Sequence, residues 1–229
     1  MQLLWIAVLL LVLCGPLAAQ EAPKDFSAAE RLLFMNDQLG NVKAPATLRY
    51  NFSKRGTLEP GYEDKVTLSL KTGADGRCCA THTEFFSAGR QVQLPDLPAA
   101  EGNPVILHFL EREVREMQRL TKGSQSHFRK RIRMAVYNAA TVQPVTLRFR
   151  GRDIAGQEVR ITPFVDDPNR PRYETLALKE YRFTLSPAVP GGLVAIRTLV
   201  AAADGAAAPL LAEELTIDGA EAPNNKTTR

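Results

Sequence analysis

Three histidines and a pair of neighbouring aspartates are the side chains best suited to chemistry in this 229-residue chain. His82, His108 and His127 are scattered, and no two of them have the spacing of a helical zinc site. Asp166 and Asp167 could bind calcium or act as paired acids, but the residues that follow them favour a turn. The sequence shows no phosphate loop, dinucleotide fingerprint or nucleophile elbow. We therefore expect no enzyme, no metal site and no cofactor.

The chain begins with an apolar leader. Leu3 to Leu13 form an unbroken apolar run, and the small residues Ala18 and Ala19 precede Gln20. This pattern is typical of a secretory signal cleaved near Ala19 or Gln20, although no Lys or Arg precedes the run. As a helix the run spans only about 16 Å, roughly half of a bilayer core. We expect a signal peptide over 1–20, a single β-rich domain over 21–219 and a disordered tail over 220–229, in a periplasmic or secreted protein.

Basic residues are concentrated in the middle of a chain whose net charge is +4. Between positions 112 and 133, eight basic residues accompany two glutamates. Such a patch attracts lipid head groups or an anionic glycolipid, and export argues against nucleic acid. The alternative is a solvated face whose charges pair at helical spacing. The candidate residues are Arg112, Arg115, Arg119, Lys122, Arg129, Arg131 and Arg133, with Lys130 as the eighth.

Removal of the leader would leave two adjacent cysteines, Cys78 and Cys79. An even number of cysteines in an exported protein favours a disulfide. Successive side chains of a strand point to opposite faces, however, so a bridge between neighbours needs a distorted peptide. We expect two separately packed thiols, with a redox-active pair as the alternative.

Two periodicities predict the elements that position these residues. Ser27 and Glu30 have the spacing of a capping box, and Gly40 supplies a stop, which predicts a helix over 28–39. Asn103 and Pro104 begin a second helix whose apolar stripe is Leu107, Leu110, Val114 and Met117. Alternating apolar and polar residues predict strands over 47–53, 65–71, 77–86, 92–94, 128–136, 145–149, 159–161, 181–185, 193–200 and 210–217.

Short connections between successive strands favour an antiparallel sheet. The expected fold is mainly β (α+β): a curved antiparallel sheet or half-barrel of about nine strands, with an N-terminal helix and one mid-chain helix packed on it. A ligand cavity between sheet and mid-chain helix would be lined by residues such as Tyr50, Phe52, Leu68 and Leu110.

The order of these elements, with Gly102, Asn103 and Pro104 opening the mid-chain helix, resembles that of the Lol-type lipoprotein carriers of the Gram-negative periplasm. The stretches 103–137 and 166–186 also resemble secreted proteobacterial proteins whose function is not known. The first resemblance implies a half-barrel whose apolar cavity holds acyl chains, and it transfers no binding residue. Two functions follow as expectations: a periplasmic binding or carrier module for an apolar or lipid-like ligand, or an envelope interaction protein that docks on a partner through its basic rim.

Overall fold

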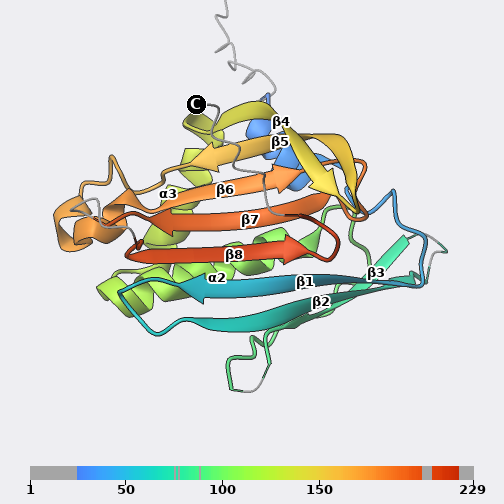
Figure 1. Cartoon of the computed structure of the whole chain (residues 1–229), viewed down its shortest axis with the longest axis horizontal. Helices are drawn as coiled ribbons and strands as arrows, with labels where there is room; N and C mark the ends of the chain where they lie inside the picture. Colours follow the sequence, from blue (N-terminus) through green and yellow to red (C-terminus); the bar gives the residue numbers. More distant parts are fainter. Residues whose placement is uncertain (1–24, 75, 77, 88, 203–207, 222–229) are drawn as a thin grey trace, which may run out of the picture.

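A single antiparallel sheet forms the body of the protein. The computed structural model describes residues 25–74, 76, 78–87, 89–202 and 208–221. Eight strands lie in the order β3-β2-β1-β8-β7-β6-β5-β4, and each neighbouring pair is antiparallel (Figure 1). β3 and β4 are the two edges, so the sheet is open. The predicted fold class, a mainly β antiparallel sheet with packed helices, is confirmed.

The strands follow the alternation of the sequence. In β1 the side chains of Leu48, Tyr50 and Phe52 are buried on one face, and Arg49 and Asn51 are exposed on the other. The predicted strand over 92–94 is reduced to an isolated bridge. The strands are β1 (Ala46–Arg55), β2 (Tyr62–Thr72), β3 (Cys78–Phe85), β4 (Thr141–Phe149), β5 (Arg152–Ile161), β6 (Glu180–Leu185), β7 (Leu193–Val200) and β8 (Leu211–Ile217).

Helices cover one face of this sheet (Figure 1). The N-terminal helix consists of α1 (Ala28–Glu30) and a π-helical turn, η1 (Arg31–Met35). Its capping box is present, because the Ser27 hydroxyl accepts from the Glu30 N–H at 3.1 Å and the Glu30 carboxylate accepts from the Ser27 N–H at 2.8 Å. The helix ends at Met35, short of the predicted position 39. The other helical elements are α2 (Pro104–Thr121), α3 (Gln125–Asn138), η2 (Arg170–Arg172) and η3 (Glu174–Leu178).

The predicted strand over 128–136 is wrong, because this segment lies within α3. Phe128, Ile132 and Val136 are buried, and their spacing of four residues places them on one face of a helix. Met134, which strand alternation would have buried beside them, is 37% exposed. The intervening arginines and lysine are good helix formers and remain on the solvent side.

The mid-chain helix α2 begins at Pro104 after the Asn103 cap, as predicted. Leu110, Val114 and Met117 are buried against the interior, but Leu107 is 56% exposed. The expectation that all four apolar residues face the sheet is therefore wrong for Leu107. Among the described residues, no helix is both long enough and apolar enough to cross a bilayer.

Cys78 and Cys79 are joined by a disulfide, contrary to the expectation of separate thiols. Lys71 pairs with Ala80 and Thr72 with Cys78, which leaves Cys79 unpaired at a bulge. At a bulge the strict alternation of side chains is interrupted. The argument from strand geometry therefore fails at this position.

The two ends of the chain test the predicted boundaries only in part. The predicted signal peptide lies outside the described residues. Of the predicted tail, Ala220 forms a bridge with Phe149, and the N–H of Glu221 donates to the carbonyl of Arg148 at 3.0 Å. These two residues thus belong to the folded domain, contrary to the boundary expected at 220.

Candidate functional site

An apolar groove lies between the N-terminal helical segment, α2 and α3. Its volume is about 390 Å³, within the range of small-molecule sites. The floor is the contact between α2 and α3, where Leu110, Val114, Ile132 and Val136 are 8%, 2%, 5% and 1% exposed. The sequence places Leu110 and Val114 on one α2 stripe, while Ile132 and Val136 meet them only because α3 is a helix.

Large apolar side chains remain exposed around this floor. Phe26, Met35 and Leu107 are 49%, 51% and 56% exposed, and Phe34 completes the lining. Seven large hydrophobic side chains are exposed among the described residues, and three of them border this groove. Exposed apolar surface gathered around one depression is the usual mark of a binding site.

Four charged side chains form the rest of the groove lining, and two of them form an ion pair. Arg129 donates to both carboxylate oxygens of Glu111, at 2.8 Å and 2.6 Å, and Arg115 lies 3.7 Å from the same carboxylate. Because of the hydrogen bond from Arg129, the pKa of Glu111 is lowered. Glu30 is held in the capping box.

The fourth charged residue of the lining, Arg133, is exposed and forms no ion pair with any described residue. Lys130, one helical turn earlier on α3, is likewise exposed and has no carboxylate partner in the described part of the chain. Residues three apart on a helix are neighbours, so the two cations form one pair beside the groove.

Of the four residues predicted to line a cavity under the sheet, three are packed in the core and the fourth lines the groove. Tyr50, Phe52 and Leu68 are 0%, 2% and 0% exposed and are members of the hydrophobic core. The hydroxyl of Tyr50 accepts a hydrogen bond from the Asn103 side chain at 2.9 Å, and burial raises the pKa of this phenol. Leu110 contributes to the groove instead. The structure therefore shifts the candidate site from the space under the sheet to the space between the helices.

The predicted basic patch is divided between buried, paired and free residues. Arg112 is only 6% exposed and lies in the interior, so it is not part of a surface patch. Arg119 contacts Glu59 and Glu116, and Arg131 lies 3.4 Å from Asp167. With Arg115 and Arg129 engaged by Glu111, only Lys122, Lys130 and Arg133 lack a carboxylate partner among the described residues.

Sequence reasoning missed a buried ion cluster formed by Arg112, Glu113, Lys179 and Glu213. Arg112 donates to Glu113 at 2.6 Å and to Glu213 at 2.7 Å. The Lys179 ammonium lies 2.5 Å from Glu113 and 3.2 Å from Glu213. All four residues are 6% exposed or less. Two cations and two carboxylates from α2, β8 and the segment before β6 therefore neutralise one another in the interior.

Burial governs the electrostatics of this cluster. Burial and the neighbouring charge of Glu213 raise the pKa of Glu113 to about 7. The pKa of Glu213 is lowered instead, because Lys179 and Arg112 outweigh its own burial. Buried carboxylates can act in catalysis, but the cations already occupy these two. The cluster thus has the properties of a structural network.

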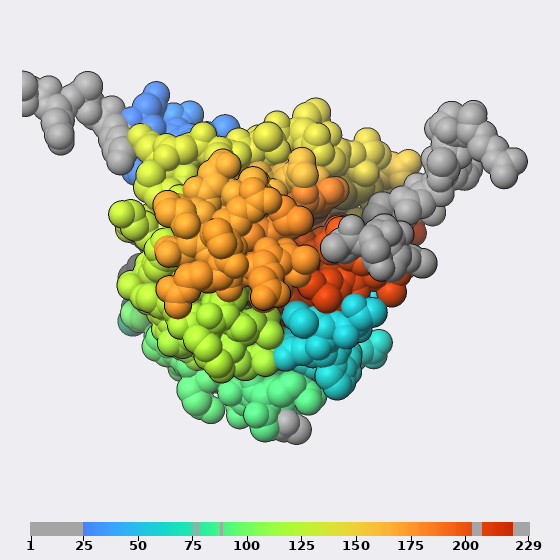
Figure 2. All heavy atoms as spheres, turned by 90° about the vertical axis from the view of Figure 1, so that its left-hand side faces the viewer, coloured from blue at the N-terminus to red at the C-terminus, as the bar shows by residue number. Residues whose placement is uncertain are grey.

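The three histidines lie on three different elements: His82 on β3, His108 on α2 and His127 on α3. The Nε2 atom of His127 lies 2.7 Å from Asp167, whose backbone carbonyl also accepts from the Arg170 N–H in a turn. Phe128 and Phe164 pack edge to face nearby. Figure 2 shows this end of the molecule, with the segment between β5 and β6, in orange, lying against the yellow-green helices. Within the described residues, no group of three or more metal-binding side chains is found.

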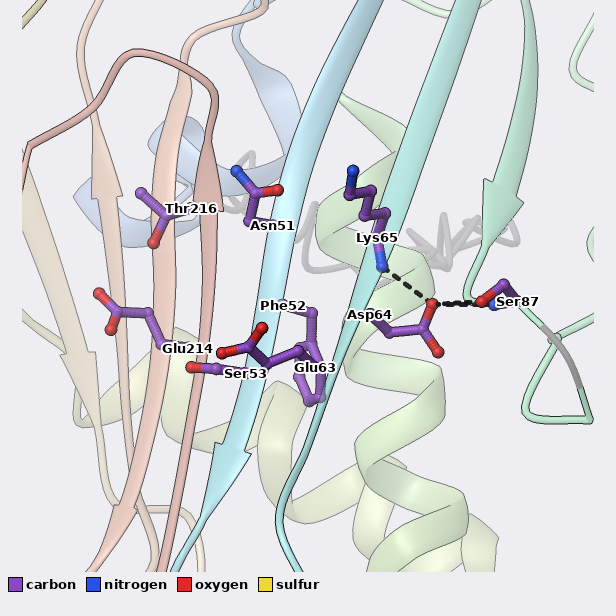
Figure 3. A pocket seen from close by; sticks show the side chains of 9 residues that line it. All are labelled: Asn51, Phe52, Ser53, Glu63, Asp64, Lys65, Ser87, Glu214 and Thr216. Carbon is purple, nitrogen blue, oxygen red and sulfur yellow. Dashed lines mark hydrogen bonds between the residues drawn. The ribbon is translucent and has the colours of Figure 1, made fainter.

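A larger hollow of about 600 Å³ lies on the sheet, where β1, β2 and β8 are neighbours. Figure 3 shows its lining, in which Asp64 accepts hydrogen bonds from the backbone of Lys65 and from Ser87. Except for Phe52, all its lining residues are polar or charged: Asn51, Ser53, Glu63, Asp64, Lys65, Ser87, Glu214 and Thr216. The hollow lacks the apolar walls of the groove, so the groove is the stronger candidate.

Comparisons with known proteins do not assign a family. No family model matches the chain, and no curated protein matches its sequence. Among solved structures, the chain is similar to the Mycobacterium tuberculosis lipoprotein LppX, with a TM-score of 0.34 and 11% identity over 87% of this chain and 99% of that chain. A similarity this low does not indicate a shared function.

Proposed function

We propose that this protein is an exported binding module that holds an apolar, acyl-chain-like ligand in the groove between α1–η1, α2 and α3. One observation carries the proposal: Phe26, Met35 and Leu107 remain about half exposed around a floor of buried aliphatic side chains. A ligand chain lying on this floor would cover the three side chains and remove their apolar surface from water. The proposal includes no catalytic step.

Leu107→Glu tests the site directly. Full burial of a leucine side chain is worth about 1.5–3 kcal/mol, so covering the exposed half of Leu107 contributes about 1 kcal/mol to binding. A carboxylate at this position must also be desolvated by the ligand. We expect Leu107→Glu to weaken binding of a dansyl-labelled fatty acid at least tenfold, measured by fluorescence titration of the purified protein.

Leu178→Glu is the matched control, because Leu178 is 48% exposed and does not border the groove. It should bind the probe as the wild type does, and both variants should unfold at the wild-type midpoint. Equal loss in the two variants, or no binding by the wild type, would contradict the proposal. Organic extraction of the wild type followed by mass spectrometry identifies any lipid that copurifies.

The second function expected from the sequence, an envelope protein docking on a partner through a basic rim, has less support. Most arginines of this rim are either buried or paired with a carboxylate: Arg112, Arg115, Arg119, Arg129 and Arg131. Paired surface charges contribute little to a complex.

A further inference from the structure

We infer that the groove opens onto a surface that docks on an anionic lipid bilayer, and that the bilayer supplies its ligand. As a route of ligand uptake, this inference rests on the proposed function. It is carried by the position of the free cations Lys130 and Arg133 beside the exposed apolar walls of the groove. Interfacial segments that bind anionic membranes combine these same two features.

The charge balance around the groove favours an anionic partner. Two carboxylates, Glu30 and Glu111, lie in the lining. Four cations lie in or beside it, and Arg115 and Arg129 already contact Glu111. Lys130 and Arg133 have no such partner in the described chain, so their full charge is available to lipid phosphates.

The apolar part of the surface fits the same partner. Phe26 precedes α1, Met35 ends η1 and Leu107 lies on α2, yet all three border one opening. The acyl boundary of a bilayer can accept such side chains, and charged groups beside them then meet the head groups. A bilayer thus satisfies both the apolar walls and the two cations.

The test uses sedimentation with vesicles of phosphatidylcholine alone or with one third phosphatidylglycerol. Each cation near an anionic surface strengthens binding about fivefold, so Lys130→Gln with Arg133→Gln should weaken binding to the anionic vesicles by about 25-fold. The matched control pair, Lys71→Gln with Arg152→Gln, removes one lysine and one arginine that are exposed on the sheet and lack carboxylate partners among the described residues. The control should bind as the wild type does, and added salt should weaken wild-type binding.

Equal binding to both vesicle types, or equal loss in the two double variants, overturns the inference. A dimer that Leu107→Glu disperses, in a protein that does not bind vesicles, would assign the groove to a second copy of the chain and overturn it too. The fatty-acid probe separates the two proposals, because probe binding is measured without vesicles. A wild type that binds the probe but shows no preference for anionic vesicles refutes the docking surface and preserves the ligand. Conversely, a wild type that prefers anionic vesicles but does not bind the fatty-acid probe refutes the proposed apolar ligand and preserves the docking surface.

Discussion

Lys179→Met measures how strongly the buried ion cluster depends on its second cation. The Lys179 ammonium lies 2.5 Å from Glu113 and 3.2 Å from Glu213, and the residue is 1% exposed, so water does not replace it. Removing one partner of a buried ion pair costs about 3–5 kcal/mol. Because Arg112 still contacts both carboxylates, we expect a loss of about 3 kcal/mol at pH 8.

The loss should be smaller at low pH. The pKa of Glu113 is about 7 in the folded protein, above its ordinary value of 4.5. A group of this kind contributes stability that is fully present below 4.5 and is lost as the pH rises through 7. Without Lys179 the folded pKa rises further, so the variant should lose about 1 kcal/mol more than the wild type between pH 5 and pH 8.

Urea unfolding followed by circular dichroism is the suitable assay, because the single tryptophan, Trp5, lies in the leader. A loss of about 3 kcal/mol moves the midpoint by about 1.5 M at a typical slope of about 2 kcal/mol/M. Lys130→Met makes the same chemical change at an exposed site and should stay within about 0.5 kcal/mol of the wild type. Adding Glu113→Gln to Lys179→Met should restore about 1–2 kcal/mol, since it removes the uncompensated carboxylate. If Lys179→Met is no less stable than Lys130→Met, the reasoning is refuted.

Two further predictions concern the same interior. Between pH 5 and pH 8 the wild type should lose up to about 3 kcal/mol of stability relative to Glu113→Gln, because only the wild type has a carboxyl group that gives up its proton on unfolding at pH values below its raised pKa. Thermal melts of both proteins at the two pH values check this. A stability difference between the two proteins that does not change with pH would contradict it. Asn103→Ala should destabilise the fold by about 2 kcal/mol or more, since Asn103 accepts from the Val105 N–H and donates to Tyr50. Asn103→Ser keeps an acceptor for the cap, so its free energy of unfolding in urea should lie between those of the wild type and Asn103→Ala. If Asn103→Ser is no more stable than Asn103→Ala, the cap contributes nothing.

The sequence predicts the sheet well because its strands are half-buried. Alternation of the kind seen at Leu48, Tyr50 and Phe52 identifies both a strand and its inner face, and eight of the predicted strands overlap the strands of the sheet. Phe128, Ile132 and Val136 fit an alternating pattern and a helical one equally, since four residues are both two strand repeats and about one helical turn. Only packing against α2 decides between them.

The candidate site is less predictable than the fold. The groove depends on the contact between α2 and α3 and on the N-terminal helix placed beside them, and the misassigned α3 segment supplies half of its floor. The buried ion cluster is hidden for a related reason. Arg112 and Glu113 look like members of a solvated charge run, and their partners Lys179 and Glu213 lie more than sixty residues away.

The position of β8 has a consequence for how the chain acquires its structure. This last strand of the described chain lies between β1 and β7, so it joins two groups of strands that are otherwise separate. Until it arrives, β1 and β7 each present an unpaired edge, and Glu213 is missing from the interior. The sheet therefore cannot be completed until β8 has been synthesised, after every other strand of the described chain.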